Sequence, residues 1–154
     1  GRIARAIVER RKAGPIETTD ELAGLIASAM PARMRHGRIH PATRSFQALR
    51  IAVNDELTSL ARGIASGIDS LKEGGRFSVI SFHSLEDRMV KELFRDASRG
   101  CTCPPDLPVC ACGGKPRLRV IARRPIRPGE AEMGRNPRAR SAKLRTAERI
   151  GGCR

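Results

Sequence analysis

The sequence predicts an α/β protein that is organised around one buried β-strand. Residues 76–82 hold four β-prone apolar side chains with only serine between them, which is typical of a strand covered on both faces by helices in a parallel sheet. The preceding pair Gly74–Gly75 can end a helix, because glycine adopts the left-handed conformation that a helix C-cap needs. The predicted order of elements corresponds to half of a βαβ unit: a helix, the glycine pair, the strand, a polar turn and a second helix. In open α/β sheets ligands bind beyond the carboxyl ends of strands, which predicts a cleft at Phe82, His83 and Ser84.

The first thirty residues predict two short amphipathic helices. Apolar residues recur at helical spacing over residues 2–12, and the basic end of this segment complements the helix dipole. Thr18 and Glu21 have the spacing of a capping box at the start of a second helix, which runs to Pro31. Both helices are expected to be packing elements without chemistry of their own.

Residues 33–43 are a basic connector between these helices and the rest of the chain. His36 and His40 have the spacing of two metal ligands on a helix. However, Gly37 and Pro41 argue against a helix, and no acidic or cysteine partner is near. A loop that contacts phosphates is the favoured interpretation.

A long helical stripe follows, because apolar residues recur every three or four positions over residues 43–71. Gly63 and Gly67 weaken this helix and could mark a break in it. Arg44 and Arg50 lie on the opposite edge near its start, where they form either a solvated face or a contact with RNA phosphates.

A second helix is predicted directly after the central strand. Ser84 is its expected N-cap, with Asp87 at the reciprocal position of a capping box and Glu86 favourable in the positive first turn. Apolar spacing continues this helix to the region of Gly100.

Two more strands are predicted nearer the carboxyl end. Residues 118–121 are predicted to form one strand. In the other, Ala142, Leu144 and Thr146 alternate with Lys143, Arg145 and Ala147. A proline-containing loop and a basic turn over residues 134–141 separate them.

The charge of the chain favours a polyanionic partner. The 154 residues include 30 Lys and Arg against 16 Asp and Glu, which gives a formal net charge of +14. Arginine dominates the cations, and its guanidinium binds phosphate in a bidentate way, so nucleic acid is favoured over a merely solvated basic surface. No segment reaches the ~18 apolar residues of a membrane span, and no leader resembles a signal peptide. The chain is therefore expected to be cytoplasmic, with its cysteines reduced or bound to metal.

Four of the five cysteines fall in a C-x-C…C-x-C arrangement within residues 101–112. Four thiolates can hold one structural Zn²⁺ tetrahedrally, although the spacing departs from the usual C-x₂₋₄-C knuckle. The alternative is a loop that carries free thiols. The candidate metal ligands are Cys101, Cys103, Cys110 and Cys112.

The dipeptide His83–Ser84 raises the possibility of a nucleophile and its base. Adjacent residues rarely face each other correctly for proton transfer, and no Gly-x-Ser-x-Gly elbow is present, so a hydrolase is disfavoured. At the end of a strand His83 would face the cleft, where it could bind substrate or accept a proton. Binding is the favoured role.

Three stretches together resemble one known family. They are residues 40–50 (HPATRSFQALR), 81–88 (SFHSLEDR) and 136–145 (NPRARSAKLR). They are similar to the RsmH (MraW) family, S-adenosylmethionine-dependent enzymes that methylate N4 of a decoding-centre cytidine in 16S rRNA. The resemblance runs over essentially the whole chain in the right order.

This resemblance implies the carboxyl-terminal half of a Rossmann-like methyltransferase core, preceded by part of an inserted helical domain. Residues 1–40 would be the end of the insert, and residues 41–154 the core portion with its Cys loop at 101–112. Residues 76–82 would be the fifth strand of that core. The strands near residues 118 and 144 would be its closing hairpin.

The resemblance also implies S-adenosylmethionine as the cofactor of the complete enzyme. The family's cofactor-binding residues have no counterpart here and are expected upstream of Gly1, so this chain alone is expected to be inactive. Its expected partner is 16S rRNA or the small ribosomal subunit. The alternative is a non-catalytic, zinc-stabilised RNA-binding module.

No residue is assigned as catalytic, and His83 is a candidate for positioning the substrate. The residues expected to contact substrate or RNA share positive charge or a position at the cleft. They are Arg44, Arg50, Phe82, His83, Ser84, Arg138, Arg140 and Arg145.

Overall fold

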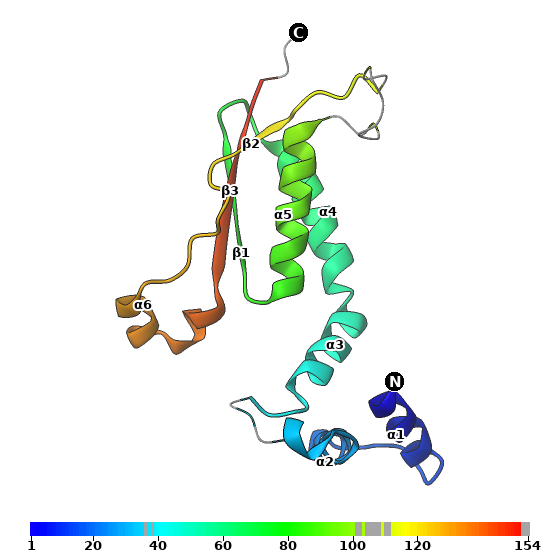
Figure 1. The fold of residues 1–154 in the computed structure, drawn as a ribbon. Coiled ribbons are helices and arrows are strands. Elements are labelled where there is room, and N and C mark those ends of the chain that lie inside the picture. Colours follow the sequence, from blue (N-terminus) through cyan, green and yellow to red (C-terminus); the bar gives the residue numbers. More distant parts are fainter. Residues whose placement is uncertain (36, 38, 101–102, 104–108, 110–111, 152–154) are drawn as a thin grey trace. The chain divides into compact units, whose positions relative to one another are not determined.

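A three-stranded antiparallel sheet, covered on one face by two helices, forms the centre of residues 57–154 (Figure 1). In this computed structural model the described residues are all except 36, 38, 101–102, 104–108, 110–111 and 152–154. The strand order is β1-β3-β2. The strands and covering helices are α4 (Glu56–Ser70), β1 (Arg76–Ser81), α5 (Ser84–Arg99), β2 (Leu118–Val120) and β3 (Lys143–Arg149).

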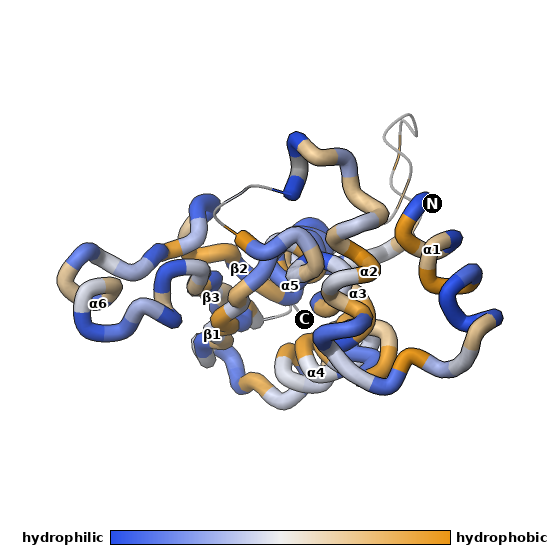
Figure 2. The backbone as a smooth tube through the Cα atoms, turned by 90° about the horizontal axis from the view of Figure 1, so that it is seen from below, coloured by the Kyte–Doolittle hydropathy of each residue, from blue (hydrophilic) through white to orange (hydrophobic). Residues whose placement is uncertain are grey.

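The core lies between the sheet and the two helices. Phe94 of α5 is 1% exposed, and its ring centroid lies 5.9 Å from that of Phe77 in β1. The buried residues of this cluster come from both helices and two strands: Ile64, Ile68, Val90, Phe94, Leu118 and Ala147. The tube view shows apolar residues along α4 and in the strands, whereas the segment around α6 (Glu130–Arg135) is mainly hydrophilic (Figure 2).

The prediction that the central strand is buried on both faces is wrong for this chain. Exposure alternates along β1, so that Phe77 and Val79 face the helices and Ile80, 59% exposed, points the other way. Within the described residues β1 pairs only with β3, and the pairing is antiparallel. Whether a strand is buried on one face or on both depends on which elements cover the two faces of its sheet. A run of apolar residues does not reveal those elements.

The two strands predicted nearer the carboxyl end are confirmed, and they pair antiparallel. Leu118 in β2 pairs with Arg149 in β3, and Phe77 in β1 pairs with Ala147 on the other side. Between β2 and β3 lie α6 and a 3₁₀ helix, η2 (Pro137–Ser141), where the sequence predicted a turn.

The expected break at Gly63 or Gly67 does not occur, because α4 runs unbroken from Glu56 to Ser70. The helical stripe is interrupted earlier, at Asp55, which has a left-handed φ of 48° and ends helix α3 (Thr43–Asn54). An apolar stripe continues through such an interruption, so periodicity alone did not reveal it.

Residues 1–56 form a second compact unit, which is described by itself. Thr18 Oγ1 accepts the Glu21 backbone N–H at 3.1 Å, which confirms half of the predicted capping box. The Glu21 carboxylate turns instead to the Glu17 N–H, at 3.3 Å, and forms an ion pair with Arg10. Besides α3, the helices of this unit are α1 (Arg2–Arg11), α2 (Thr19–Ala29) and the 3₁₀ helix η1 (Ala32–Met34).

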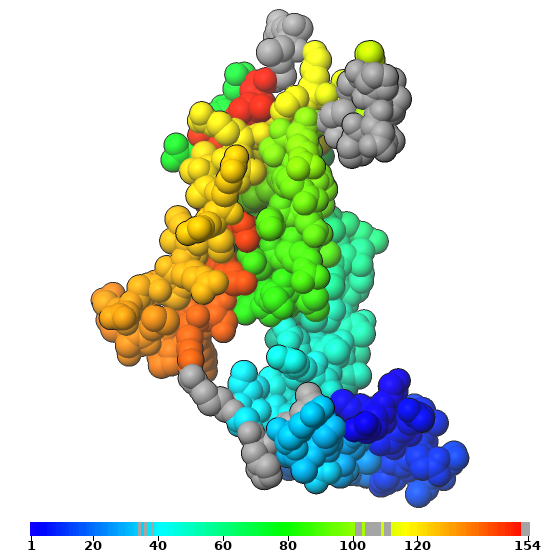
Figure 3. All heavy atoms as spheres, in the orientation of Figure 1, coloured from blue at the N-terminus to red at the C-terminus, as the bar shows by residue number. Residues whose placement is uncertain are grey.

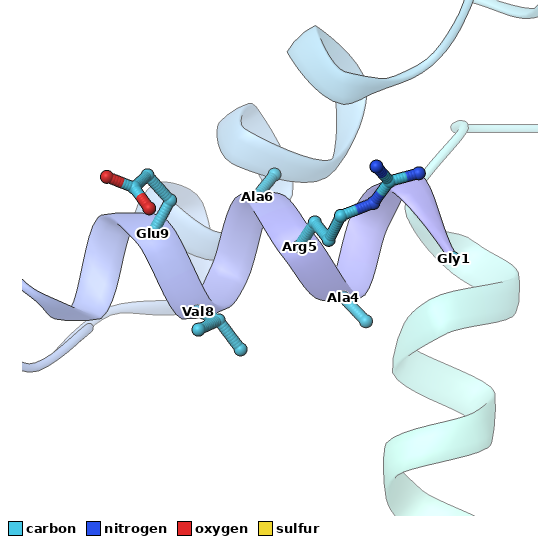
Figure 4. Close-up of a pocket in the computed structure, with 6 residues that line it drawn as sticks. All are labelled: Gly1, Ala4, Arg5, Ala6, Val8 and Glu9. Atoms are coloured by element: carbon cyan, nitrogen blue, oxygen red, sulfur yellow. The ribbon is translucent and has the colours of Figure 1, made fainter.

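A shallow hollow of about 550 Å³ runs along α1. In Figure 4 Ala4 and Val8 point to one side of the helix, and Arg5, Ala6 and Glu9 point to the opposite side. None of the residues predicted to form a site lies in it.

The division between the two compact units falls at residues 56 and 57. It does not test whether residues 1–40 belong to an inserted domain, which stays a prediction. No helix among the described residues is long and apolar enough to cross a membrane.

Candidate nucleic-acid interface

A pocket of about 260 Å³ lies at the carboxyl end of β1, where the sequence predicted a cleft. The register pairs Ser81 with Lys143, so the residues after β1 meet the residues before β3 at the same end of the sheet (Figure 1). One side of the pocket is formed by Phe82, His83 and Ser84. The opposite side carries cations and small residues: Arg127, Arg140, Ser141, Ala142 and Lys143.

The start of α5 fixes the position of His83. Its Nδ1 accepts the backbone N–H of Glu86 at 3.3 Å, and Glu86 Oε2 accepts the N–H groups of Phe82 at 2.9 Å and His83 at 3.2 Å. The N-cap is therefore His83 with Glu86 as its reciprocal partner, and the prediction of Ser84 with Asp87 is wrong by one residue. Histidine rarely appears in capping rules, which favour Ser, Thr, Asp and Asn.

This cap limits what His83 can do chemically. Because Nδ1 accepts a hydrogen bond, the neutral imidazole carries its proton on Nε2, which then acts only as a donor. Nε2 lies 3.1 Å from Glu86 Oε1 but has no hydrogen-bond partner within the described residues. The side chain is 12% exposed. Nε2 is itself a buried atom, so the role that this geometry shows for His83 is to cap α5 and line the pocket.

Phe82 and two arginines form the open part of the pocket. Phe82 is 55% exposed, which is unusual for a phenylalanine that follows a core strand. Arg127 and Arg140 are exposed, and within the described part of the chain neither forms an ion pair. An exposed aromatic ring beside unpaired guanidinium groups can stack a base and bind phosphate.

Asp87, which does not cap the helix, binds two cations of β3 instead. Its carboxylate accepts Lys143 Nζ at 3.0 Å and Arg145 Nε at 2.7 Å. Burial alone would raise the pKa of Asp87, but the hydrogen bonds from Arg145 and Lys143, with their charges, outweigh it and hold the pKa below 3.8. The carboxylate thus stays ionised and holds Arg145, which is only 9% exposed.

The structure brings four of the eight predicted contact residues together at this pocket, namely Phe82, His83, Ser84 and Arg140. Arg145 lines a different pocket and is paired with Asp87. Arg138 is exposed in η2, where its backbone N–H donates to Asn136 Oδ1 at 3.2 Å.

Arg44 and Arg50 belong to residues 1–56, and both are exposed. Arg50 forms an ion pair with Glu56 at 2.8 Å, whereas Arg44 has no ion-pair partner among the described residues. Their predicted contact with RNA stays a prediction.

Sequence reasoning missed Arg127 and Lys143 as pocket residues. Ile126 and Leu144 exchange two backbone hydrogen bonds of 2.9 Å, which place Arg127 beside the start of β3. The only signal in the sequence was the pair Pro125 and Pro128, which marked this segment as a loop.

Two of the four proposed zinc ligands fall outside the described residues. Cys101 and Cys110 are not described, and Cys112 Sγ accepts the Gly114 N–H at 3.4 Å. The zinc site stays a prediction.

Known proteins similar to this chain define its class. Two proteins named "Ribosomal RNA small subunit methyltransferase H", from Syntrophus aciditrophicus (strain SB) and Trichlorobacter lovleyi, are 61% and 59% identical to it over 150 residues. A third with that name, from Thermomicrobium roseum, is 58% identical over 148 residues. The class is therefore that of methyltransferases.

A model of the MraW methylase family matches residues 1–150. The chain belongs to the MraW methylase family. The first two relatives are matched over 97% of this chain but 48% of their own length, so the chain spans about half the length of the curated relatives it matches.

Proposed function

We propose that this chain forms the RNA-holding wall of an S-adenosylmethionine-dependent rRNA methyltransferase. The complete enzyme would methylate N4 of a cytidine in the decoding centre of 16S rRNA. The pocket at the end of β1 carries the proposal. It combines an exposed aromatic ring and a histidine fixed by its helix cap with two arginines that form no ion pair among the described residues.

Single-stranded RNA is bound by aromatic stacking and cationic contacts to the backbone. Phe82 offers a ring face for a base, and Arg127 and Arg140 offer bidentate contacts to phosphate. The formal net charge of +14 adds long-range attraction for a polyanion. Family membership supports rRNA as the nucleic acid.

The residues present at this pocket do not fit S-adenosylmethionine. The cofactor carries two cationic groups, the sulfonium and the ammonium, against one carboxylate, whereas the charged residues of the lining are three cations: Arg127, Arg140 and Lys143. We therefore assign no residue of this chain to the cofactor, which supplies the methyl group in the complete enzyme. On this proposal the chain alone is inactive.

The arrangement of the strands supports a Rossmann-like core in the complete enzyme. In β1-β3-β2 the middle strand is antiparallel to both neighbours, as expected of a fifth strand followed by a closing hairpin. The exposed outer face of β1, marked by Ile80, supports a core that continues beyond the described elements. On this proposal residues 1–40 end an inserted domain and residues 41–154 belong to the core.

The chemistry asks mainly for positioning. The exocyclic amine of cytosine is a weak nucleophile, because its lone pair is delocalised into the ring, so it must be held in line with the methyl donor. Phe82 would fix the plane of the base, and His83, by capping α5, would hold the segment that carries Phe82 in place. Arg127 and Arg140 would hold the flanking phosphates.

RNA binding by the 154-residue chain tests this proposal. Fluorescence anisotropy would compare a small-subunit rRNA hairpin that carries the target cytidine with the same hairpin made abasic at that position. Stacking on Phe82 predicts about tenfold tighter binding of the cytidine hairpin, since a stacked base contributes about 1–3 kcal/mol. Phe82→Ala should abolish the preference, and Phe46→Ala in the other unit is the matched control. Equal affinity for both hairpins in the unaltered chain would refute the proposal.

A further inference from the structure

A second pocket, of about 500 Å³, lies on residues 57–154 between the carboxyl-terminal half of α5 and the segment that follows β2. Figure 3 shows this segment (yellow to gold) beside α5 (green). The floor includes Phe94 and Val120. Five cations line the pocket: Lys91, Arg95, Arg99, Arg123 and Arg145.

Three of these cations share one face of α5. Lys91, Arg95 and Arg99 follow one another at intervals of four residues, which places their side chains in a row. Like charges at this spacing repel, so the row is unfavourable unless anions lie against it. Asp87 begins the same row, but its carboxylate is bound to Lys143 and Arg145.

Among the described residues, little negative charge compensates the cations of this pocket. Arg95 Nε lies 3.1 Å from Asp96 Oδ1, and both side chains are about half exposed. Lys91, Arg99 and Arg123 form no ion pair within the described residues. The two carboxylates are therefore already engaged, and three cations remain for a ligand.

The position of Arg123 is tied to the buried ion group. Arg145 Nη1 donates to the Arg123 carbonyl at 3.4 Å, while Arg145 Nε is held by Asp87. This hydrogen bond therefore connects the segment after β2 to β3, at the part of the segment that faces α5.

We propose that this second pocket binds the phosphodiester backbone of the RNA, at a subsite separate from the pocket at the end of β1. The inference rests on the proposed function. The ligand is backbone rather than base, because Phe94 is 1% exposed and offers no free ring face. The Ser98 hydroxyl donates to the Arg95 carbonyl at 2.7 Å, so it is not free to donate to a base.

One carboxylate connects the two pockets. Asp87 holds Lys143, which lines the first pocket, and Arg145, which lines the second. Two positions along a strand are about 7 Å apart, which is less than the length of a few nucleotides of an RNA strand. A single RNA strand can therefore contact both pockets.

Salt-dependent RNA binding tests the inference. The double variant Lys91→Gln with Arg99→Gln would be compared with Arg62→Gln plus Lys72→Gln, which also removes one lysine and one arginine from exposed positions of residues 57–154. We expect the pocket variant to bind the rRNA hairpin about tenfold more weakly, with its slope of log K against log[KCl] reduced by about 1.4 for two lost phosphate contacts. The control should lose less than about twofold, since it removes only charge that does not line the pocket.

Equal losses in the two variants would overturn the inference, while the proposed function would stand as long as the unaltered chain binds the hairpin. If the unaltered chain fails to bind the hairpin, the proposed function itself fails. Thermal unfolding would check that the variants fold. Arg123 lies outside any helix or strand, so Arg123→Gln provides a second test, and it too should bind the hairpin more weakly than the control. The alternative is that the second pocket binds a free nucleotide. In that case the chain would bind ATP, the double variant would lose this binding, and its affinity for the hairpin would equal that of the control. This result would also overturn the inference.

Discussion

The role of Asp87 shows what a single residue can do in this fold and how far sequence could foresee it. Capping rules assigned it to the start of α5, but His83 and Glu86 take that position. The carboxylate instead holds Arg145 and Lys143, which lie more than fifty residues later in the sequence. Local rules describe neighbours along the chain, whereas this contact depends on the register between β1 and β3.

Replacing Asp87 with Asn should destabilise the chain by about 2–3 kcal/mol at pH 7, because Arg145 would lose its charged partner while staying buried. The pKa of Asp87 is lowered by folding, so its contribution is present above 3.8 and is lost as the pH falls through the folded value. Urea unfolding at pH 7 and at pH 3 would measure both effects.

The expected result is a large difference between Asp87→Asn and the unaltered chain at pH 7 that shrinks at pH 3. Asp96→Asn is the control, since Asp96 is exposed and its ion pair among the described residues is with Arg95. The same difference at both pH values would show that the Asp87 carboxylate does not act through its charge.

At the scale of elements, the order of helices and strands was largely predictable from the sequence. The burial of each element and the break between two of the helices were not. The helix that starts after the central strand ends at Gly100 as predicted, because a glycine C-cap follows a clear apolar stripe. The one-sided burial of β1 and the break at Asp55 were missed, since apolar spacing reports neither what lies across a sheet nor a single left-handed residue.

The two glycines of α4 give a matched test of its packing. A Cβ at Gly67 would lie 2.6 Å from Phe77 Cζ, whereas nothing lies within 4 Å of a Cβ at Gly63. Gly67→Ala should therefore destabilise the chain by about 1–3 kcal/mol through overpacking. Gly63→Ala should stabilise it by about 0.5–1 kcal/mol, because alanine is the better helix former.

Differential scanning calorimetry of the two variants would measure these effects as shifts of Tm in opposite directions. A Gly67→Ala variant as stable as Gly63→Ala would mean that α4 does not approach β1 as closely as described.

At the scale of the whole molecule, the family and the position of the candidate site were predictable, and the composition of the site was only partly so. Phe82, His83, Ser84 and Arg140 meet at one pocket because two separate motifs flank paired strands. Arg127 joins them through a bridge between Ile126 and Leu144 that no sequence pattern marked. The charge of the chain indicated a polyanion but not which arginines would be left unpaired.

The central claim is that the end of β1 lies against the target nucleotide, and photo-crosslinking tests it most directly. A small-subunit rRNA hairpin with 4-thiouridine in place of the target cytidine would be irradiated with the chain, digested with trypsin and mapped by mass spectrometry. We predict the adduct on the peptide of residues 77–88, which follows Arg76, ends at Arg88 and contains Phe82. Adducts confined to peptides outside this segment and outside residues 125–145 would contradict the account.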